Sequence, residues 1–203
     1  MKIAGNLFPL LAILLCSLVA AAPKAGAQGL FGPRTPMKKP SELIHRQAPP
    51  VINRGLENTI TQDNSHVLIS LSRQRAYLMT GDQVYIDTPV STGKRAGMTP
   101  TGTFHIQEKD LNHRSNVYGN FVDRSGRVVR SGVSTRIDSA PSGTHYEGAP
   151  MKYFCRLTSN GVGFHIGILP GYPASHGCVR LPAEIAPLIY AKVRVGTLAV
   201  IQP

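Results

Sequence analysis

The stretch GVGFHIGILPGYPASHGCVRLP, residues 161–182, sets a cysteine, Cys178, directly after Ser175-His176-Gly177. A second histidine, His165, stands upstream at the end of an apolar, strand-like run. A histidine close to a cysteine can take the thiol proton, and the ion pair then holds the sulfur as a nucleophilic thiolate at neutral pH. The stretch therefore predicts thiolate chemistry, with Cys178 as the nucleophile and His165 as its general base.

The residues beside Cys178 suggest how a substrate would be held. Gly177 lets the backbone approach a substrate and aim amide N–H groups at an oxyanion. Arg180 carries a planar fork of donors that either binds a substrate carboxylate or anchors the loop. Ser175 is a candidate for substrate contact and is expected to bond within the turn. His176 either shapes the loop or assists in the oxyanion hole, and the structural role is favoured.

His165 followed by Ser175-His176-Gly177-Cys178-Val179-Arg180 resembles the signature of the L,D-transpeptidases, the YkuD-type catalytic domain of bacterial cell-wall enzymes. The resemblance covers roughly His66 to Ile201 and includes three upstream segments, 67–71, 91–94 and 99–104. It implies a β-sandwich-like catalytic fold in which His165 matches the histidine that activates the cysteine. Some members carry Asn where this chain has Arg180. A backbone carbonyl after His165, from Ile166 or Gly167, is a candidate for orienting its ring in place of an aspartate.

The same residues have other interpretations. A cysteine outside such a motif is more often a structural thiol, and a histidine within an apolar strand is more often a core residue. The combined motif favours catalytic roles for Cys178 and His165 over both alternatives. A zinc site of His165, His176 and Cys178 has suitable ligand types but lacks the usual short paired spacing and a fourth ligand. No metal and no other cofactor is therefore expected. Tyr153 and Tyr172 lie near the motif in sequence and are candidates for lining the substrate groove or for packing.

The charge of the chain favours anionic partners. The 203 residues include 22 Lys and Arg against 11 Asp and Glu, a formal net charge of +11. No run of consecutive basic residues forms a nucleic-acid arm, so nucleic acid is not the expected partner. Anionic wall polymer or lipopolysaccharide fits better, and a solvated basic surface without a dedicated partner stays open.

Two cysteines remain if residues 1–22, which are predicted to be a signal peptide, are removed. Cys16 lies within this segment, which leaves Cys155 and Cys178 in an oxidising compartment. A permanent bridge between these two would abolish the chemistry. Cys155 is therefore expected to be a small buried hydrophobe. A reversible redox lock between the two cysteines is the alternative.

Residues 1–22 read as a secretory signal peptide, with Lys2, an apolar core over 7–19 and small residues at the end. Cleavage after Ala22 or Ala27 would leave no transmembrane segment and an exported protein in the periplasm or cell wall. Residues 23–64 are rich in proline and predict a linker or an arm lying on the domain. Residues 65–203 are expected to form the catalytic domain.

Alternating apolar residues predict a mainly β domain. The expected strands are 67–71, 76–80, 84–90, 103–107, 154–157, 162–166 and 198–201. One C-terminal helix is expected to begin near Leu181 with Pro182 in its first turn. Residues 111–150 are polar and glycine-rich and predict a long excursion with a hairpin at 121–129, and the resemblance implies that this insertion forms a lid over the groove.

The predicted function is that of an exported cysteine L,D-transpeptidase acting on peptidoglycan stem tetrapeptides through a Cys178 thioester. It would form 3→3 cross-links or attach another amine acceptor, including a lysine of an envelope protein. The same site could instead serve an L,D-carboxypeptidase or hydrolase, with water as acceptor. A non-catalytic wall-binding protein is the alternative from a different class.

Overall fold

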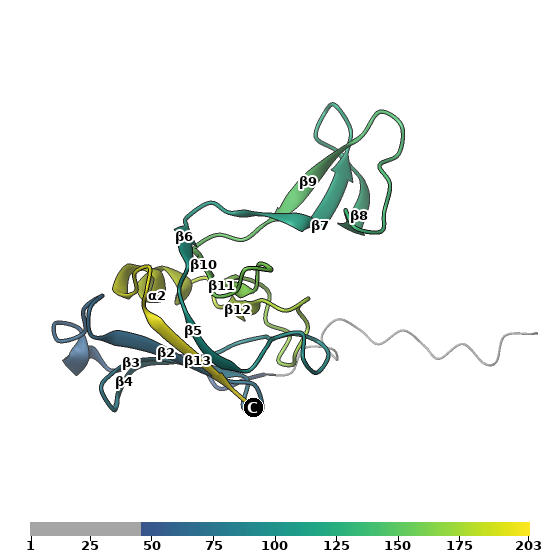
Figure 1. Ribbon diagram of the computed structural model, residues 1–203. Coiled ribbons are helices and arrows are strands. Elements are labelled where there is room, and N and C mark those ends of the chain that lie inside the picture. The colour runs from purple at the N-terminus through teal and green to yellow at the C-terminus, as the bar shows by residue number, and fades with distance from the viewer. Residues whose placement is uncertain (1–45) are drawn as a thin grey trace, which may run out of the picture. The chain divides into compact units, whose positions relative to one another are not determined.

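The computed structural model describes residues 46–203 and contains a six-stranded sheet in the order β1-β4-β3-β2-β13-β5 (Figure 1). Its strands are β1 (Val51–Ile52), β2 (Ser65–Ser70), β3 (Arg75–Thr80), β4 (Gln83–Pro89), β5 (Gly102–His105) and β13 (Leu198–Gln202). Val67, Ile69 and Leu78 are buried, and the residues between them are partly exposed, as expected for strands with one face on a core. The last strand, β13, lies parallel to β2 and antiparallel to β5.

A second sheet has four strands. One of them contains His165, and another begins directly after Cys178. The order of this sheet is β12-β11-β10-β6, with β6 (Glu108–Asp110), β10 (Phe154–Arg156), β11 (Gly163–Ile166) and β12 (Val179–Leu181). Strands β11 and β12 are parallel, and their register pairs His165 with Arg180. Cys178 is the residue immediately before β12. Parallel pairing therefore brings the two ends of the motif together across the loop 167–178.

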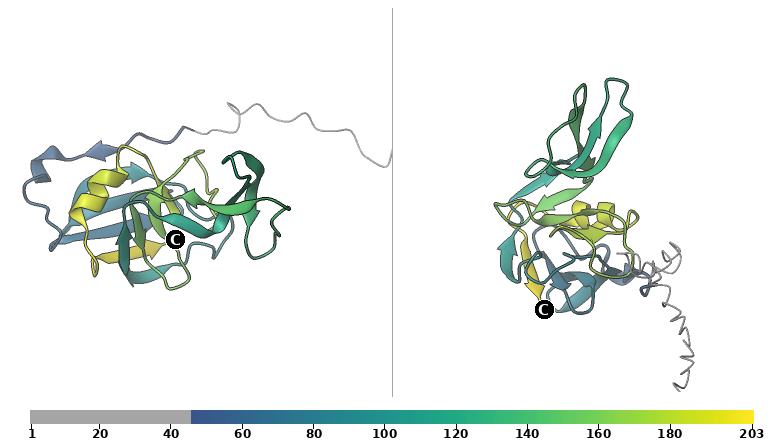
Figure 2. Two further views of the ribbon diagram at one scale, coloured as in Figure 1. Left: turned by 90° about the horizontal axis from the view of Figure 1, so that it is seen from above. Right: turned by 90° about the vertical axis from the view of Figure 1, so that its right-hand side faces the viewer.

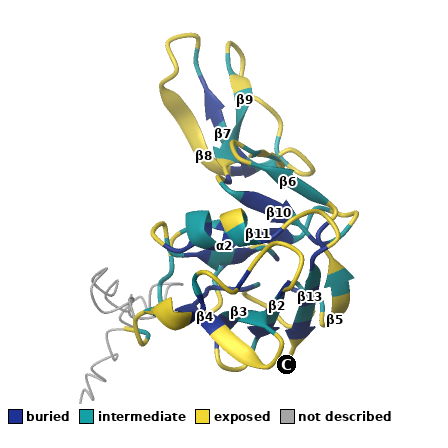
Figure 3. Ribbon diagram, turned by 90° about the vertical axis from the view of Figure 1, so that its left-hand side faces the viewer, coloured by how far each residue is buried: buried dark blue, intermediate teal, exposed yellow. Residues whose placement is uncertain are grey.

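The core lies between these two sheets and the helix α2 (Ala186–Lys192), which is the α-helix of the described residues. Figure 3 shows the buried residues gathered along these elements. Fully buried side chains come from every layer: Ile69, Leu78, Ile86, Phe154, Leu181 and Ile189. This mainly β architecture with one helix confirms the fold class predicted from the sequence.

The helix starts later than predicted. Leu181 belongs to β12 and residues 183–185 form a turn, so the helix begins at Ala186 and not near Leu181. Pro187, not Pro182, lies in its first turn. The first N–H groups of a helix have no intrahelical partner, and a proline there removes no helical hydrogen bond. Pro187 therefore fits the start that the structure shows.

The insertion forms a third sheet and not only a hairpin. Its order is β8-β7-β9, with β7 (Arg114–Val122), β8 (Val128–Ser134) and β9 (His145–Pro150). Figures 1 and 2 show it standing out from the other two sheets, joined to them next to β6 and β10. Gly119 and Gly148 allow β7 and β9 to approach, because a Cβ at either would collide with the opposite backbone. Because the segment is polar and its strand pairing contains register shifts, its residues do not alternate regularly between apolar and polar. The sequence pattern therefore did not predict this sheet.

The described end of the Pro-rich arm lies on the domain. Strand β1 pairs with β4, a 3-10 turn η1 (Arg54–Leu56) follows, and Leu56 and Ile60 join the core. Arg75 donates to the Ala48 carbonyl at 2.6 Å. The predicted signal peptide, residues 1–22, and arm residues 23–45 lie outside the described residues. No helix within residues 46–203 has the length and apolar character needed to cross a membrane.

Cys155 is part of the core. It lies in β10, is fully buried and forms no disulfide. Burial raises the pKa of its thiol to about 12, with Lys109 opposing that rise. Such a thiol remains protonated at neutral pH and packs as a small apolar group. The structure thus bears out the buried-hydrophobe interpretation of Cys155 and shows no bond to Cys178.

Candidate active site

A cavity of about 970 Å³ joins the insertion to the second sheet. We call it the Cys178 cavity. Most of the residues predicted for the site line it: Cys178, His165, His176, Arg180 and Ser175. The insertion contributes residues from β7, from the segment after β8 and from the end of β9, including Tyr118, Arg136 and Pro150. Most of the residues predicted for the site are therefore gathered in one cavity, and its wall includes residues of the insertion, for which the sequence predicted only a hairpin at 121–129.

Cys178 presents a free, partly buried thiol to this cavity. Its Sγ lies 3.6 Å from the carbonyl oxygen of Gly161, to which the thiol donates. Burial raises the pKa of the thiol, whereas the Gly163 amide and the guanidinium groups of Arg180 and Arg156 lower it. Burial has the larger effect, so the protein without substrate holds Cys178 mainly as the thiol.

His165 is buried, and its tautomer follows from its neighbour. Nδ1 lies 2.6 Å from the carbonyl oxygen of Ile166, one of the two carbonyls expected to orient the ring. A carbonyl only accepts, so Nδ1 carries the hydrogen and Nε2 keeps the lone pair. Burial lowers the pKa of His165 to about 4, and the charges of Arg180 and His113 act in the same direction. At neutral pH the ring is therefore an uncharged base.

The free site does not hold the ion pair that the sequence suggested. A histidine with a pKa of about 4 cannot keep the proton of a thiol whose pKa is raised. Among the hydrogen bonds of residues 46–203, none joins the sulfur to His165. Burial of both groups disfavours their charged forms, and this effect cannot be seen in the sequence. Cys178 and His165 thus rest as a neutral thiol and a neutral imidazole.

This neutral pair predicts how the reactivity of Cys178 depends on pH in the absence of substrate. Below the thiol pKa, the thiolate fraction rises about tenfold per pH unit, so alkylation by iodoacetamide should accelerate about tenfold per unit between pH 6 and pH 8. The measurement is the rate of mass gain on the Cys178 peptide, with Cys155 as a buried internal control. A rate that stays constant over that range would show a preformed thiolate and contradict the neutral pair.

The loop before Cys178 is held by its own side chains. Ser175 Oγ donates to the Cys178 carbonyl at 2.5 Å and accepts from the Gly177 amide at 3.0 Å, which confirms its expected bonding within the turn. The Gly177 amide, a candidate for the oxyanion, is thereby engaged in the loop. Gly177 has φ +138°, and a Cβ there would lie 2.8 Å from the Met98 carbonyl oxygen. Glycine is thus required at this position by backbone conformation and by space.

His176 connects this loop to the insertion. Its ring stacks on Tyr118 of β7, with centroids 4.2 Å apart and planes at 17°. Lys94 Nζ lies 3.3 Å from His176 Nε2. Partial burial, followed by the charge of Lys94, lowers the pKa of His176, which favours the neutral ring. These contacts favour the structural role for His176. Tyr118 escaped sequence reasoning because it lies far upstream in a segment without clear periodicity.

Arg180 extends from β12 into the Cys178 cavity. Its Nη1 lies 3.4 Å from the Ile168 carbonyl, and no carboxylate of the described residues pairs with it. Gly167 makes room for its stem, because a Cβ at Gly167 would lie 2.6 Å from Arg180 Cγ. Both expected roles therefore find support: the side chain touches a loop carbonyl and faces the cavity.

The two tyrosines predicted near the site do not line the cavity. Tyr153 has φ +56° and packs edge-on against Tyr190 of α2, with centroids 5.5 Å apart. Tyr172 is 39% exposed, and its carbonyl accepts from Ser91 Oγ at 2.8 Å. The contact of Tyr153 with Tyr190 favours the packing alternative for that residue. The cavity wall instead includes His113, Arg136, Arg156 and Asn160.

A possible metal-ligand cluster lies at the base of the insertion. Glu108, Asp110 and His113 bring their ligand atoms within 4.8 Å of one another. Each carboxylate already has a partner: Arg156 Nε lies 2.6 Å from Glu108, and His113 Nδ1 lies 3.0 Å from Asp110. These contacts account for the cluster as an Arg156–Glu108 ion pair beside a His113–Asp110 hydrogen bond, and it carries no metal assignment.

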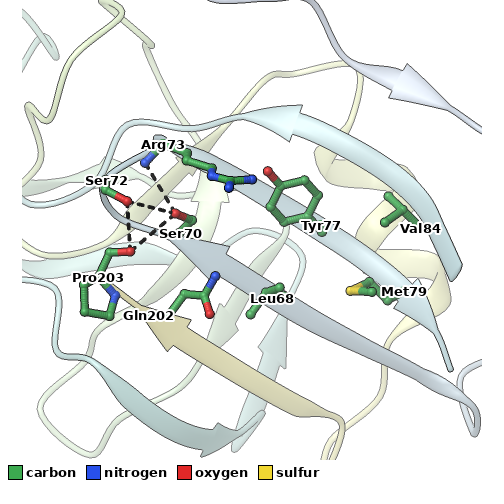
Figure 4. A pocket seen from close by; sticks show the side chains of 9 residues that line it. All are labelled: Leu68, Ser70, Ser72, Arg73, Tyr77, Met79, Val84, Gln202 and Pro203. Carbon is green, nitrogen blue, oxygen red and sulfur yellow. Dashed lines mark hydrogen bonds between the residues drawn. The ribbon is translucent and has the colours of Figure 1, made fainter. Parts of the chain in front are cut away.

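A second hollow of about 420 Å³ lies on the six-stranded sheet, on the face opposite the core (Figure 4). Leu68, Tyr77 and Met79 line it, and Ser72 Oγ donates to the Pro203 carbonyl oxygen at 3.0 Å. No cysteine, histidine, aspartate or glutamate lines this hollow. Groups suited to nucleophilic catalysis are therefore found in the Cys178 cavity and not here.

Comparison with known proteins gives a consistent result. Residues 64–201 match the profile of the YkuD family, described as the L,D-transpeptidase catalytic domain. Among solved structures, the chain is similar to an L,D-transpeptidase from Mycobacterium smegmatis, with a TM-score of 0.52 and 21% identity over 69% of this chain and 59% of that one. An L,D-transpeptidase in complex with imipenem gives a TM-score of 0.51 and 22% identity over 68% and 59%.

At these identities the structural likeness concerns the fold. The matched region spans about three fifths of the length of both solved chains. The search of curated proteins finds no match.

Proposed function

The chain belongs to the L,D-transpeptidase catalytic domain family, and from this premise we propose that it is an exported cysteine acyltransferase of peptidoglycan stem peptides. One observation carries the proposal: Cys178 and His165 come from adjoining segments of the parallel pair β11–β12 and line one cavity. Its volume of about 970 Å³ suits a peptide-sized ligand. The sequence of residues 1–22 supports export to the periplasm or cell wall.

In the proposed first half-reaction, Cys178 Sγ attacks the carbonyl carbon between the L centre of meso-diaminopimelate and the terminal D-alanine. His165 Nε2 takes the thiol proton as the C–S bond forms, since the two groups rest as a neutral pair. The tetrahedral oxyanion is stabilised by backbone amides near Cys178. It collapses when His165 returns the proton to the departing amine, which leaves a thioester and free D-alanine.

In the second half-reaction, an acceptor amine attacks the thioester. Its nitrogen gives a proton to His165, the C–S bond breaks, and the sulfur leaves with that proton. An amine of a second stem gives a 3→3 cross-link, and a lysine of an envelope protein gives a protein attached to the wall. With water as acceptor the product is a tripeptide, the result of an L,D-carboxypeptidase. The same residues serve all three outcomes.

The remaining site residues receive supporting roles in this proposal. Arg180 binds a substrate carboxylate, because its guanidinium faces the cavity without an acidic partner among residues 46–203. Ser175 fixes the turn that presents Cys178, through its two hydrogen bonds. His176, stacked on Tyr118, holds the insertion against the nucleophile loop. Tyr153 and Tyr172 are left out of the site.

The proposed function is tested by the products formed from purified disaccharide-tetrapeptide. Mass spectrometry should find a dimer that has lost one D-alanine, which identifies a stem amine as acceptor. Monomeric tripeptide as the sole product would identify water as the acceptor and favour the hydrolase. If the tetrapeptide is unchanged while the protein binds wall polymer in a salt-dependent way, the enzyme proposal fails in favour of a wall-binding protein.

A further inference from the structure

The charges of the insertion are almost fully paired. Residues 111–150, here called the lid segment, contain five arginines and three carboxylates. Each carboxylate pairs with one arginine: Arg114 with Glu147 at 2.9 Å, Arg127 with Asp123 at 3.1 Å and Arg130 with Asp138 at 2.6 Å. Two arginines of the lid segment remain without a carboxylate, Arg124 and Arg136.

These two unpaired arginines differ in their position. Arg136 lines the Cys178 cavity, whereas Arg124 lies in the turn between β7 and β8 and does not. Arg180 lines the same cavity from β12, also without a carboxylate partner in the described chain. Arg156 lines it too, but its Nε contacts Glu108 at 2.6 Å. No aspartate or glutamate lines the cavity, so two guanidinium groups face it uncompensated.

Such an arrangement calls for an anionic ligand. A concave site lined by charge of one sign focuses its field on the interior. Arg180 is partly buried and Arg136 is exposed, and either guanidinium can hold a carboxylate through two parallel hydrogen bonds. Burial lowers the pKa of Arg180, which reflects the cost of a charge that lacks a partner. Because both arginines line one cavity, they can hold two separate carboxylates.

We propose that Arg136 binds the free carboxylate at the D centre of diaminopimelate in the acyl donor, while Arg180 binds the carboxylate of the terminal D-alanine. This assignment rests on the proposed function. Arg180 follows Cys178 by two residues and so serves the carboxylate next to the scissile bond. Arg136, on the lid segment, serves the carboxylate at the far end of the diaminopimelate side chain. The enzyme is thus selective for donors whose diaminopimelate is a free acid and not a carboxamide.

The test compares D-alanine release from two tetrapeptide donors that differ only in that group, a free carboxylate or a carboxamide. The parent should prefer the free acid by about two- to five-fold in kcat/KM, the range expected for an ion pair made by an exposed arginine. In Arg136→Gln the preference should fall to near one, because the variant loses activity on the free acid and keeps it on the carboxamide. Arg124→Gln removes the same charge from the same segment and should keep the full preference.

The outcomes separate this inference from the proposed function. Equal release from both donors by the parent, or an undiminished preference in Arg136→Gln, would overturn the role of Arg136 and leave the acyltransferase intact. A preference lost equally in Arg124→Gln would overturn it as well, since net charge would then be the cause. If the parent releases D-alanine from neither donor, the proposed function fails and this inference with it.

Discussion

Replacing Cys178 with alanine is expected to abolish D-alanine release from the tetrapeptide donor, by at least ~10⁴-fold, the scale seen when a catalytic nucleophile is removed. The fold should survive, because the shortest contacts that hold the loop use backbone carbonyls, whereas the sulfur makes one long contact with the Gly161 carbonyl, at 3.6 Å. Ser175 Oγ donates to the Cys178 carbonyl, and Thr99 Oγ1 donates to the preceding carbonyl, that of Gly177, at 2.6 Å. The measurement combines D-alanine release with the mass of protein exposed to a carbapenem, which should form an adduct with the parent and none with Cys178→Ala.

Cys155→Ala is the matched control for that variant. It removes the other thiol of the described chain, which is buried in the core and has no path to a substrate. It should keep both the adduct and the release of D-alanine, with some loss of thermal stability from the smaller core side chain. Residual turnover of the Cys178→Ala variant at a substantial fraction of the parent rate would contradict thioester catalysis. Loss of the adduct in Cys155→Ala with Cys178 intact would point to a coupling between the cysteines.

Replacing His165 with glutamine should slow acylation by about 10²- to 10⁴-fold, the usual contribution of a general base. The effect should be near the upper end, because the thiol pKa is raised and little thiolate forms without a base. Above pH 6 the parent imidazole is fully neutral, since its pKa is lowered to about 4. Single-turnover release of D-alanine at pH 7 measures the effect directly.

His113→Gln provides the comparison for His165→Gln. His113 also lines the Cys178 cavity, but its Nδ1 is paired with Asp110 at 3.0 Å and its ring stacks on Phe154 at 4.3 Å. We expect its replacement to change the acylation rate by no more than a few-fold. Should His165→Gln acylate as fast as the parent, the proton must leave the sulfur by another route, and His165 would lose its assigned role.

Local patterns were sufficient to predict most of the scaffold. Alternation in β2 and β3 revealed the strands that place Val67 and Leu78 in the core, because one face of each strand is buried. The thiol and imidazole of Cys178 and His165 were identified from residue types and order, and the parallel pairing of β11 with β12 brings their segments together. The start of the helix was predicted too early, since Pro182 and Pro187 are both compatible with a first turn.

What escaped prediction depends on contacts between distant segments. The Tyr118–His176 stack joins β7 to the nucleophile loop, and no local pattern marks either residue as a partner of the other. Arg136 is distinguished by two features that only the fold shows: three of the other four arginines of its segment are paired, and the fourth, Arg124, does not line the cavity. The neutral state of Cys178 and His165 follows from burial of both groups, which depends on the complete fold.

The most direct test of the central claim is the mass of the protein during turnover with the disaccharide-tetrapeptide donor. Rapid acid quenching should trap a species heavier by the donor minus D-alanine, and peptide mapping should place the added mass on Cys178. The thioester should disappear when an amine acceptor is added. If products accumulate while Cys178 stays unmodified, or if the added mass lies on another residue, the account of this protein as a cysteine acyltransferase would be contradicted.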